Sequence, residues 1–167
     1  MKIALLTDTH FGARNDSLLF IDFFRKFYEN VFFPTLKERG ITDVIHLGDV
    51  VDRRKFINYK TLNSMKEIFF HPLKEMGGNV RIIVGNHDIY YKNTLKVTVY
   101  SDPCEVSLTE DHKVLFLPWI CADNEDKSKE LIEKTRTKVA FGHLQIAGIE
   151  SDKGSFMMEG HSIPMFK

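Results

Sequence analysis

Four apolar segments of this chain each end in polar side chains, and this arrangement restricts the folds open to it. The segments are IALLT, VIHLG, RIIVG and KVAFG; the polar residues after them are Asp8 and His10, Asp49 and Asp52, Asn86 and His87, and His143. Between them, residues 17–39 and 60–76 carry apolar residues at helical spacing. Strands that alternate with helices favour an α/β fold.

The polar residues at these strand ends are expected to form one site. In an open α/β sheet, ligands bind at the carboxyl ends of the strands. Glycine precedes the polar residue in three of the four segments, at Gly48, Gly85 and Gly142, as a tight turn or a close approach would require. Each residue alone has an ordinary explanation as a turn or cap residue. Four strand ends in order along the chain, each followed only by oxygen or imidazole ligands, indicate a common site.

The other expected elements follow from periodicity and turn residues. The helix over 17–39 is capped by Asp16 or Ser17 and kinked or divided at Pro34, with Phe20, Phe24, Phe27 and Val31 on its core face. Pro72 distorts the end of the helix over 60–76. Strands over 95–100, 112–119 and 138–142 and a charged helix over 124–135 indicate an antiparallel element or a second sheet.

Composition adds limits. A chain of 167 residues with 43% apolar residues is expected to form one domain. Its 23 basic residues balance 23 acidic ones, so a polyanion must be bound by local patches. The chain shows neither a signal peptide nor a membrane span, which predicts a cytoplasmic protein. Cys104 and Cys121 are too isolated for a zinc site and are expected to be reduced thiols.

The ligand types indicate phosphoester hydrolysis. Aspartate, asparagine and histidine without thiolate suit manganese, magnesium, iron or zinc, and one carboxylate can bridge two ions. Two such ions bind a phosphoryl group and generate a hydroxide nucleophile at neutral pH.

The motifs D-x-H at Asp8, G-D-x-x-D at Gly48, G-N-H-D at Gly85 and G-H at Gly142 resemble, in order, the signature of the calcineurin-like metallophosphoesterases. Within that superfamily, the segments MKIALLTDTHFG and GDVVDRRKFINY look most like the nuclease subunit of SbcC–SbcD-type DNA repair complexes, particularly phage recombination endonuclease subunits. The resemblance implies a two-sheet sandwich flanked by helices. It also implies metal-dependent hydrolysis of DNA, an SbcC-type ATPase partner, a homodimer formed through helices near the second and third motifs, and, for a phage protein, the host cytoplasm.

The resemblance also assigns roles to residues. Asp8, His10 and Asp49 hold the first ion; Asp49, as the bridge, Asn86 and His143 hold the second, with Mn²⁺ or Mg²⁺ expected. His87 lies beside the scissile phosphate outside the metal shell, where it binds transition-state charge or protonates the leaving oxygen. Asp52 orients His87, and Arg53 and Arg54 are candidate phosphate contacts or solvated side chains.

Other readings stay open. GDVVDR also resembles the equivalent block of Ser/Thr protein phosphatases, which continue with Gly where this chain has Arg54. An inactive scaffold of the same fold is a third reading. The family's G-H-x-H motif has no match after His143, so residues 1–167 are expected to be a nuclease domain lacking its last strands and capping domain, with weak activity or none. The rival view is that His161 replaces the missing pair.

Overall fold

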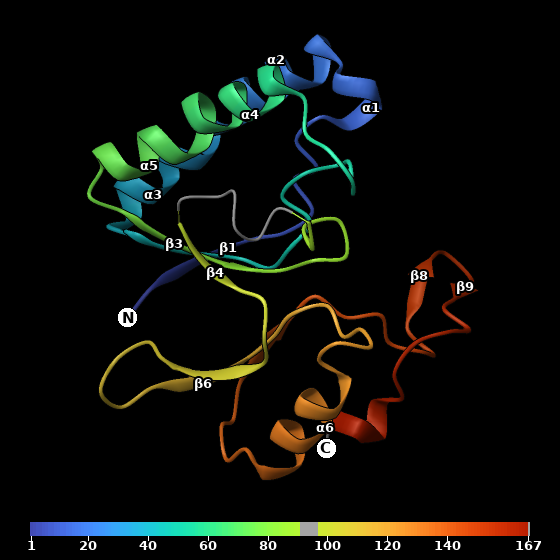
Figure 1. Cartoon of the computed structure of the whole chain (residues 1–167). Coiled ribbons are helices and arrows are strands. Elements are labelled where there is room, and N and C mark those ends of the chain that lie inside the picture. Colours follow the sequence, from blue (N-terminus) through green and yellow to red (C-terminus); the bar gives the residue numbers. More distant parts are fainter. Residues whose placement is uncertain (91–96, 167) are drawn as a thin grey trace. The chain divides into compact units, whose positions relative to one another are not determined.

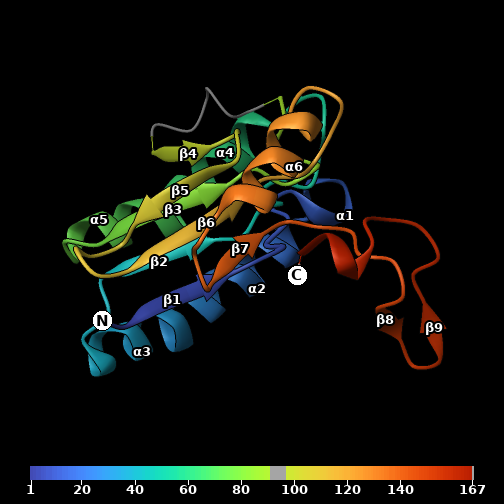
Figure 2. The ribbon, with the colours of Figure 1, turned by 90° about the horizontal axis from the view of Figure 1, so that it is seen from below.

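The computed structural model describes residues 1–90 and 97–166. The chain divides into two units, Met1–Val99 and Tyr100–Lys167. Figure 1 labels most of their helices and strands, and Figure 2 also labels β2, β5 and β7. Residues 95 and 96 of the strand expected over 95–100 lie outside the described residues. Over the ranges that are described, no helix combines the length and the apolarity that crossing a membrane would need.

The first unit is built on a sheet of order β1-β2-β3-β4. Its strands are β1 (Ile3–Leu6), β2 (Asp43–His46), β3 (Asn79–Ile83) and β4 (Thr98–Tyr100). The first three are parallel, and their register pairs Leu6 with His46 and His46 with Ile82. Their carboxyl ends are therefore level, so the loops that follow begin at the same edge of the sheet. The expected α/β class with parallel strands is confirmed.

Two helical segments cover one face of this sheet (Figure 1). The first comprises α1 (Ala13–Asp16), α2 (Leu18–Phe27), the π-helical turn η1 (Tyr28–Phe32) and α3 (Phe33–Arg39). The second comprises α4 (Tyr59–Met65), the π-helical turn η2 (Lys66–Phe70) and α5 (His71–Glu75). Seen from below, α2 and α3 run beside β1 (Figure 2). Residue Ser17 occupies the expected cap position of α2, without a side-chain hydrogen bond.

Each π-helical turn directly precedes a helix whose first turn contains a proline. The N–H of Phe33 donates to the carbonyl of Tyr28 before Pro34, and the N–H of His71 donates to the carbonyl of Lys66 before Pro72. Proline lacks an N–H and its ring collides with the carbonyl four residues back. A wider turn removes that collision without ending the helix. Pro34, which was expected to kink or divide the first helix, follows a π-helical turn that separates α2 from α3 without ending the helical segment.

The core face of α2 differs from the one expected. Phe20, Phe27 and Val31 are 39%, 36% and 53% exposed, so their assignment to the core is wrong. Phe24 packs against the core as expected, and the buried cluster takes Ile21, Tyr28 and Phe32 from α2 and η1. Apolar residues extend over more than half of the circumference of α2, and the packing partners select which part of that arc is buried.

The second unit contains a mixed sheet of order β5-β6-β7, a separate β8-β9 pair, one α-helix and a 3-10 turn. The elements are β5 (Cys104–Ser107), β6 (Lys113–Leu117), α6 (Glu125–Lys134), β7 (Ala140–Gly142), β8 (Glu150–Asp152), β9 (Ser155–Phe156) and η3 (Ile163–Phe166). β5 and β6 are antiparallel, whereas β6 and β7 are parallel and connected through α6. The expected second sheet is confirmed; β5, β8 and β9 were not predicted individually. Both cysteines are free thiols.

Candidate metal centre

The loops after β1 and β2 are paired beyond the ends of their strands. Backbone N–H groups of Asp8, His10 and Phe11 donate to the carbonyls of Gly48, Asp49 and Val50 at 3.0, 3.0 and 2.8 Å. This pairing keeps the D-x-H motif beside the G-D-x-x-D motif. Asp8, His10 and Asp49 have left-handed backbones, with φ of 52°, 44° and 54°. Non-glycine residues adopt this conformation at a cost of about 1–3 kcal/mol each, and such strain clusters at functional sites.

His46, at the end of β2, supports these loops from below. It is fully buried; the N–H of Gly48 donates to its Nδ1 at 3.3 Å, and its Nε2 lies 3.0 Å from Thr9 Oγ1. Because Nδ1 accepts, the proton resides on Nε2, which donates to Thr9. The hydroxyl of Thr9 in turn donates to the carbonyl of Val50 at 3.2 Å. These hydrogen bonds are mutually consistent, so His46 supports the loops that carry the site.

The loop after β3 approaches the other two through Gly85. A Cβ on Gly85 would lie 2.2 Å from Asp49 Oδ1 and 2.4 Å from the Asp49 nitrogen, so only glycine allows this approach. The N–H of His87 donates to Asp49 Oδ1 at 2.9 Å. The carboxylate of Asp49, only 4% exposed, is thereby fixed by the third loop.

Asp88 binds the second loop to the third, a role that sequence analysis did not assign. Its Oδ1 accepts from the N–H groups of Val50 and Val51 at 3.0 and 3.3 Å, and its Oδ2 accepts from the N–H of Gly85 at 3.1 Å. Burial raises the pKa of Asp88 above its ordinary value, and these backbone donors oppose the rise. The G-N-H-D motif contained the signal, since Asp88 directly follows His87.

Side chains from all three loops face one gap. His10 Nε2 lies 3.6 Å from Asp8 Oδ1 and 3.7 Å from Asp49 Oδ2, and His87 Nε2 lies 3.9 Å from the same Asp49 oxygen. These separations are too long for hydrogen bonds. One donor atom each from His10, Asp49 and His87 falls within 4.8 Å of the others. Imidazole and carboxylate donors grouped at this spacing fit a divalent cation.

The surroundings of His10 support this fit. His10 Nδ1 is buried and has no hydrogen-bond partner among the described residues; Asp52 Oδ1 lies 3.7 Å from it. The carboxylates of Asp8, Asp49 and Asp52 thus surround one imidazole. A cation between them would offset their mutual repulsion.

His87 is oriented by Asp52, but through the backbone. Its Nδ1 is hydrogen-bonded to the carbonyl of Asp52, whereas the carboxylate of Asp52 faces His10. The Nε2 of His87 therefore points toward Asp49 and lies 3.5 Å from the guanidinium of Arg54. In this position it can either bind the ion or face a phosphoryl group next to it. The resemblance implied that His87 is not a metal ligand, and this stays a prediction.

The remaining predicted residues are placed as follows. Asn86 is half-buried between Gly85 and His87. Arg53 is ion-paired with Asp16 at 3.0 Å. His143 directly follows β7 in the second unit, where its N–H donates to the carbonyl of Leu117 at 3.1 Å and its ring lies 6.0 Å from Trp119. Its role as a metal ligand stays a prediction.

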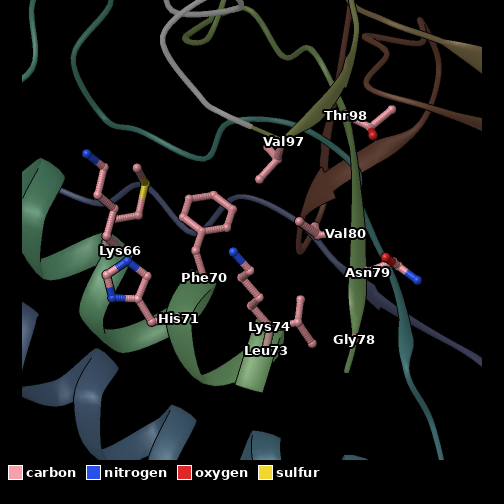
Figure 3. A pocket seen from close by; sticks show the side chains of 11 residues that line it. Lys66, Phe70, His71, Leu73, Lys74, Gly78, Asn79, Val80, Val97 and Thr98 are labelled. Carbon is pink, nitrogen blue, oxygen red and sulfur yellow. The ribbon is translucent and has the colours of Figure 1, made fainter. Parts of the chain in front are cut away.

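A cavity of about 530 Å³ in the first unit lies elsewhere (Figure 3). It is lined by Phe70 and Leu73 of the second helical segment and by Asn79 and Val80 of β3. Asn79 begins β3, whereas the ligand loop follows the other end of that strand. The chemistry of the strand-end loops is therefore separate from this cavity.

The loops at the carboxyl ends of the parallel strands place aspartate and histidine side chains around one gap. This arrangement is that of a metallophosphoesterase. The chain belongs to the calcineurin-like phosphoesterase family, and the match to this family covers residues 1–163. Members of this family bind divalent metals, and the His10, Asp49 and His87 group could hold such an ion.

The chain is similar to individual proteins as well. It is 31% identical over 180 residues to exonuclease subunit 1 of Enterobacteria phage T4, in an alignment that covers 98% of this chain and 50% of the relative. The chain thus spans about half the length of that relative. A crystal structure of a protein of unknown function from Aquifex aeolicus shares the fold, with a TM-score of 0.50 and 18% identity, and covers 96% of this chain and 87% of its own.

Proposed function

We propose that the chain is the catalytic domain of a metal-dependent nuclease that hydrolyses DNA phosphodiester bonds. The observation that carries the proposal is the convergence of Asp8, His10, Asp49 and His87 on one gap. The phage relative is an exonuclease subunit, which supports a nucleic acid as the substrate and a complex as the working form; DNA is the nucleic acid that the resemblance implies. An ATPase of the SbcC type is the partner that the resemblance implies.

In this proposal Asp8, His10 and Asp49 hold one divalent ion, and Asp49, Asn86 and His143 hold another, with manganese preferred over magnesium. When bound, such ions supply charge neutralisation at the phosphoryl group and lower the pKa of water. Asp49 is suited to bridging two ions because its two carboxylate oxygens have different neighbours. Oδ1 accepts from the His87 N–H, and Oδ2 faces His10 and His87.

His87 and Arg54 act on the substrate. The Nδ1 of His87 is held by the carbonyl of Asp52, so a proton gained or lost by the ring is exchanged at Nε2. The guanidinium of Arg54, 3.5 Å from Nε2, places a fixed positive charge where negative charge develops on a transferred phosphoryl group. Of the two arginines that follow Asp52, we assign the phosphate contact to Arg54, because its guanidinium lies beside His87 Nε2.

A second copy of this chain is proposed as a further partner. On α2 and η1, Leu19, Phe23 and Val31 are 82%, 68% and 53% exposed and lie along one side of the segment. A row of large apolar side chains of this kind marks an interaction surface. We propose that a second copy covers this row, which differs from the helices near the second and third motifs that the resemblance implied for a homodimer.

The variant Asp49→Asn tests the catalytic proposal. Asparagine keeps an oxygen to accept from the N–H of His87 but removes the charge that a bridging ligand needs. We expect loss of manganese-dependent hydrolysis of linear DNA and of bis-nitrophenyl phosphate, with folding retained by circular dichroism. The control Asp111→Asn changes an exposed carboxylate in the turn between β5 and β6 and should leave activity unchanged. Normal turnover in Asp49→Asn would refute the metal assignment, and a wild-type preference for nitrophenyl phosphate over both diesters would favour the phosphatase reading.

A further inference from the structure

The segment after Asp52 has a composition unlike that of the whole chain. Residues 53–60 read RRKFINYK, with four basic residues, two aromatic residues and no acidic residue. The complete chain balances 23 basic with 23 acidic residues. Positive charge interleaved with aromatic rings is the combination that binds single-stranded nucleic acid. The segment directly follows the motif that supplies Asp49 and Asp52.

Arg53 anchors the segment to the loop after β1. Its guanidinium is hydrogen-bonded to Asn15 and ion-paired with Asp16 at 3.0 Å, and the hydroxyl of Thr61 donates to Asp16 at 2.6 Å. Asn15 and Asp16 have left-handed backbones, with φ of 61° and 60°. These contacts neutralise the carboxylate of Asp16 and fix residues 53–60 against the loop after β1. A ligand would therefore meet an ordered surface.

Phe56 packs on Arg53 and forms an aromatic platform. The guanidinium carbon of Arg53 lies 4.6 Å from the centre of the Phe56 ring, which covers one ring face by a cation–π contact. The side chain is nevertheless 56% exposed, which leaves much of the opposite face to solvent. Tyr59, three residues later, is 76% exposed. Rings presented in this way are suited to stacking on a flat ligand.

A hollow of about 450 Å³ adjoins the platform. Its wall includes Phe56, the amide side chains of Asn15 and Asn58, and the cations of Arg53 and Lys60. This volume is in the range that accommodates a ligand of nucleotide size. Asp16 also lines the hollow and is ion-paired with Arg53, so the charge left in the wall is that of Lys60, which favours an anion. The ring of Phe56 favours a planar group. A nucleotide unit of a DNA strand offers both.

We propose that Phe56 stacks on an unpaired base of the DNA strand next to the scissile phosphate, with Lys60 contacting the adjoining phosphate. This inference rests on the proposed nuclease function and deepens it by specifying the substrate. A base inside a duplex has both faces covered by its neighbours, so Phe56 can reach only a base at an end or in a single strand. The platform therefore selects unpaired ends.

Binding experiments with paired ligands test the stacking directly. Fluorescence anisotropy in EDTA, where hydrolysis does not occur, compares a short oligothymidylate with an abasic oligomer of the same length and charge. The wild type should bind the oligothymidylate about tenfold more tightly. Phe56→Ala should bind the two oligomers equally. Lys60→Ala should weaken both equally and lower the salt dependence of binding. The matched control is Phe156→Ala, which removes a ring that is 58% exposed in the second unit and should keep the wild-type preference.

The outcomes separate this inference from the proposed function. A wild-type chain without preference for bases, a Phe56→Ala variant that keeps the preference, or an equal loss in Phe156→Ala would overturn the platform. Loss of the preference in Phe56→Ala alone supports it. If DNA hydrolysis is absent while Phe56-dependent binding is present, the nuclease proposal fails and the base-stacking site stands. If hydrolysis depends on Asp49 but the affinity for the oligomers does not change in Phe56→Ala, the nuclease proposal stands and the base-stacking site fails.

Discussion

Substituting Gly85 by alanine should disrupt the metal centre while the fold survives. The added Cβ would lie 2.2 Å from Asp49 Oδ1 and 2.4 Å from the Asp49 backbone nitrogen, where ordinary contact begins at 3.4 Å. Relief requires a relative shift of about 1 Å between the second and third loops, and a misplacement of that size can cost about a hundredfold in rate. The same overpacking should lower the free energy of unfolding by about 1–3 kcal/mol.

The assay for Gly85→Ala combines manganese binding by calorimetry, hydrolysis of bis-nitrophenyl phosphate and thermal unfolding. Gly78→Ala is the matched control, because its Cβ would lie 2.6 Å from Leu73 Cδ1. Both glycines lack a positive φ, so each substitution acts through steric overlap alone. Gly78→Ala should lose a similar amount of stability and keep its manganese affinity. If Gly85→Ala binds manganese as tightly as the wild type, the argument from close approach is wrong.

Two further predictions concern the helical layer. Tyr28 is fully buried, and among the described residues its hydroxyl has no hydrogen-bond partner; Tyr28→Phe should therefore stabilise the protein by about 1 kcal/mol, or about 2–4 °C in Tm, and a lower Tm would refute this. Phe23→Glu places a charge in the exposed apolar row of α2 and should convert a dimer to a monomer in light scattering, with Glu67→Gln as a surface control; a wild-type monomer would contradict the dimer proposal.

The sequence by itself determined the elements and the candidate ligands. Asp8, Asp49 and His87 were identified because they directly follow apolar strand segments, and the parallel register that makes those strand ends level follows from the α/β alternation. Pro34 indicated the division of the first helix because its effect on the backbone is local. Gly85 was expected at a close approach, and a Cβ there would overlap Asp49.

Only the tertiary structure decided which atoms meet. Asp52 holds His87 through its carbonyl, and its carboxylate faces His10, a distinction that residue type does not encode. Asp88 joins two loops because three N–H groups converge on it from segments distant in sequence. On α2, the apolar arc is wider than the surface available to cover it, so local periodicity could not choose between Phe27 and Tyr28. Packing against the sheet and the second helical segment made that choice, because burial depends on neighbours that lie far away along the chain.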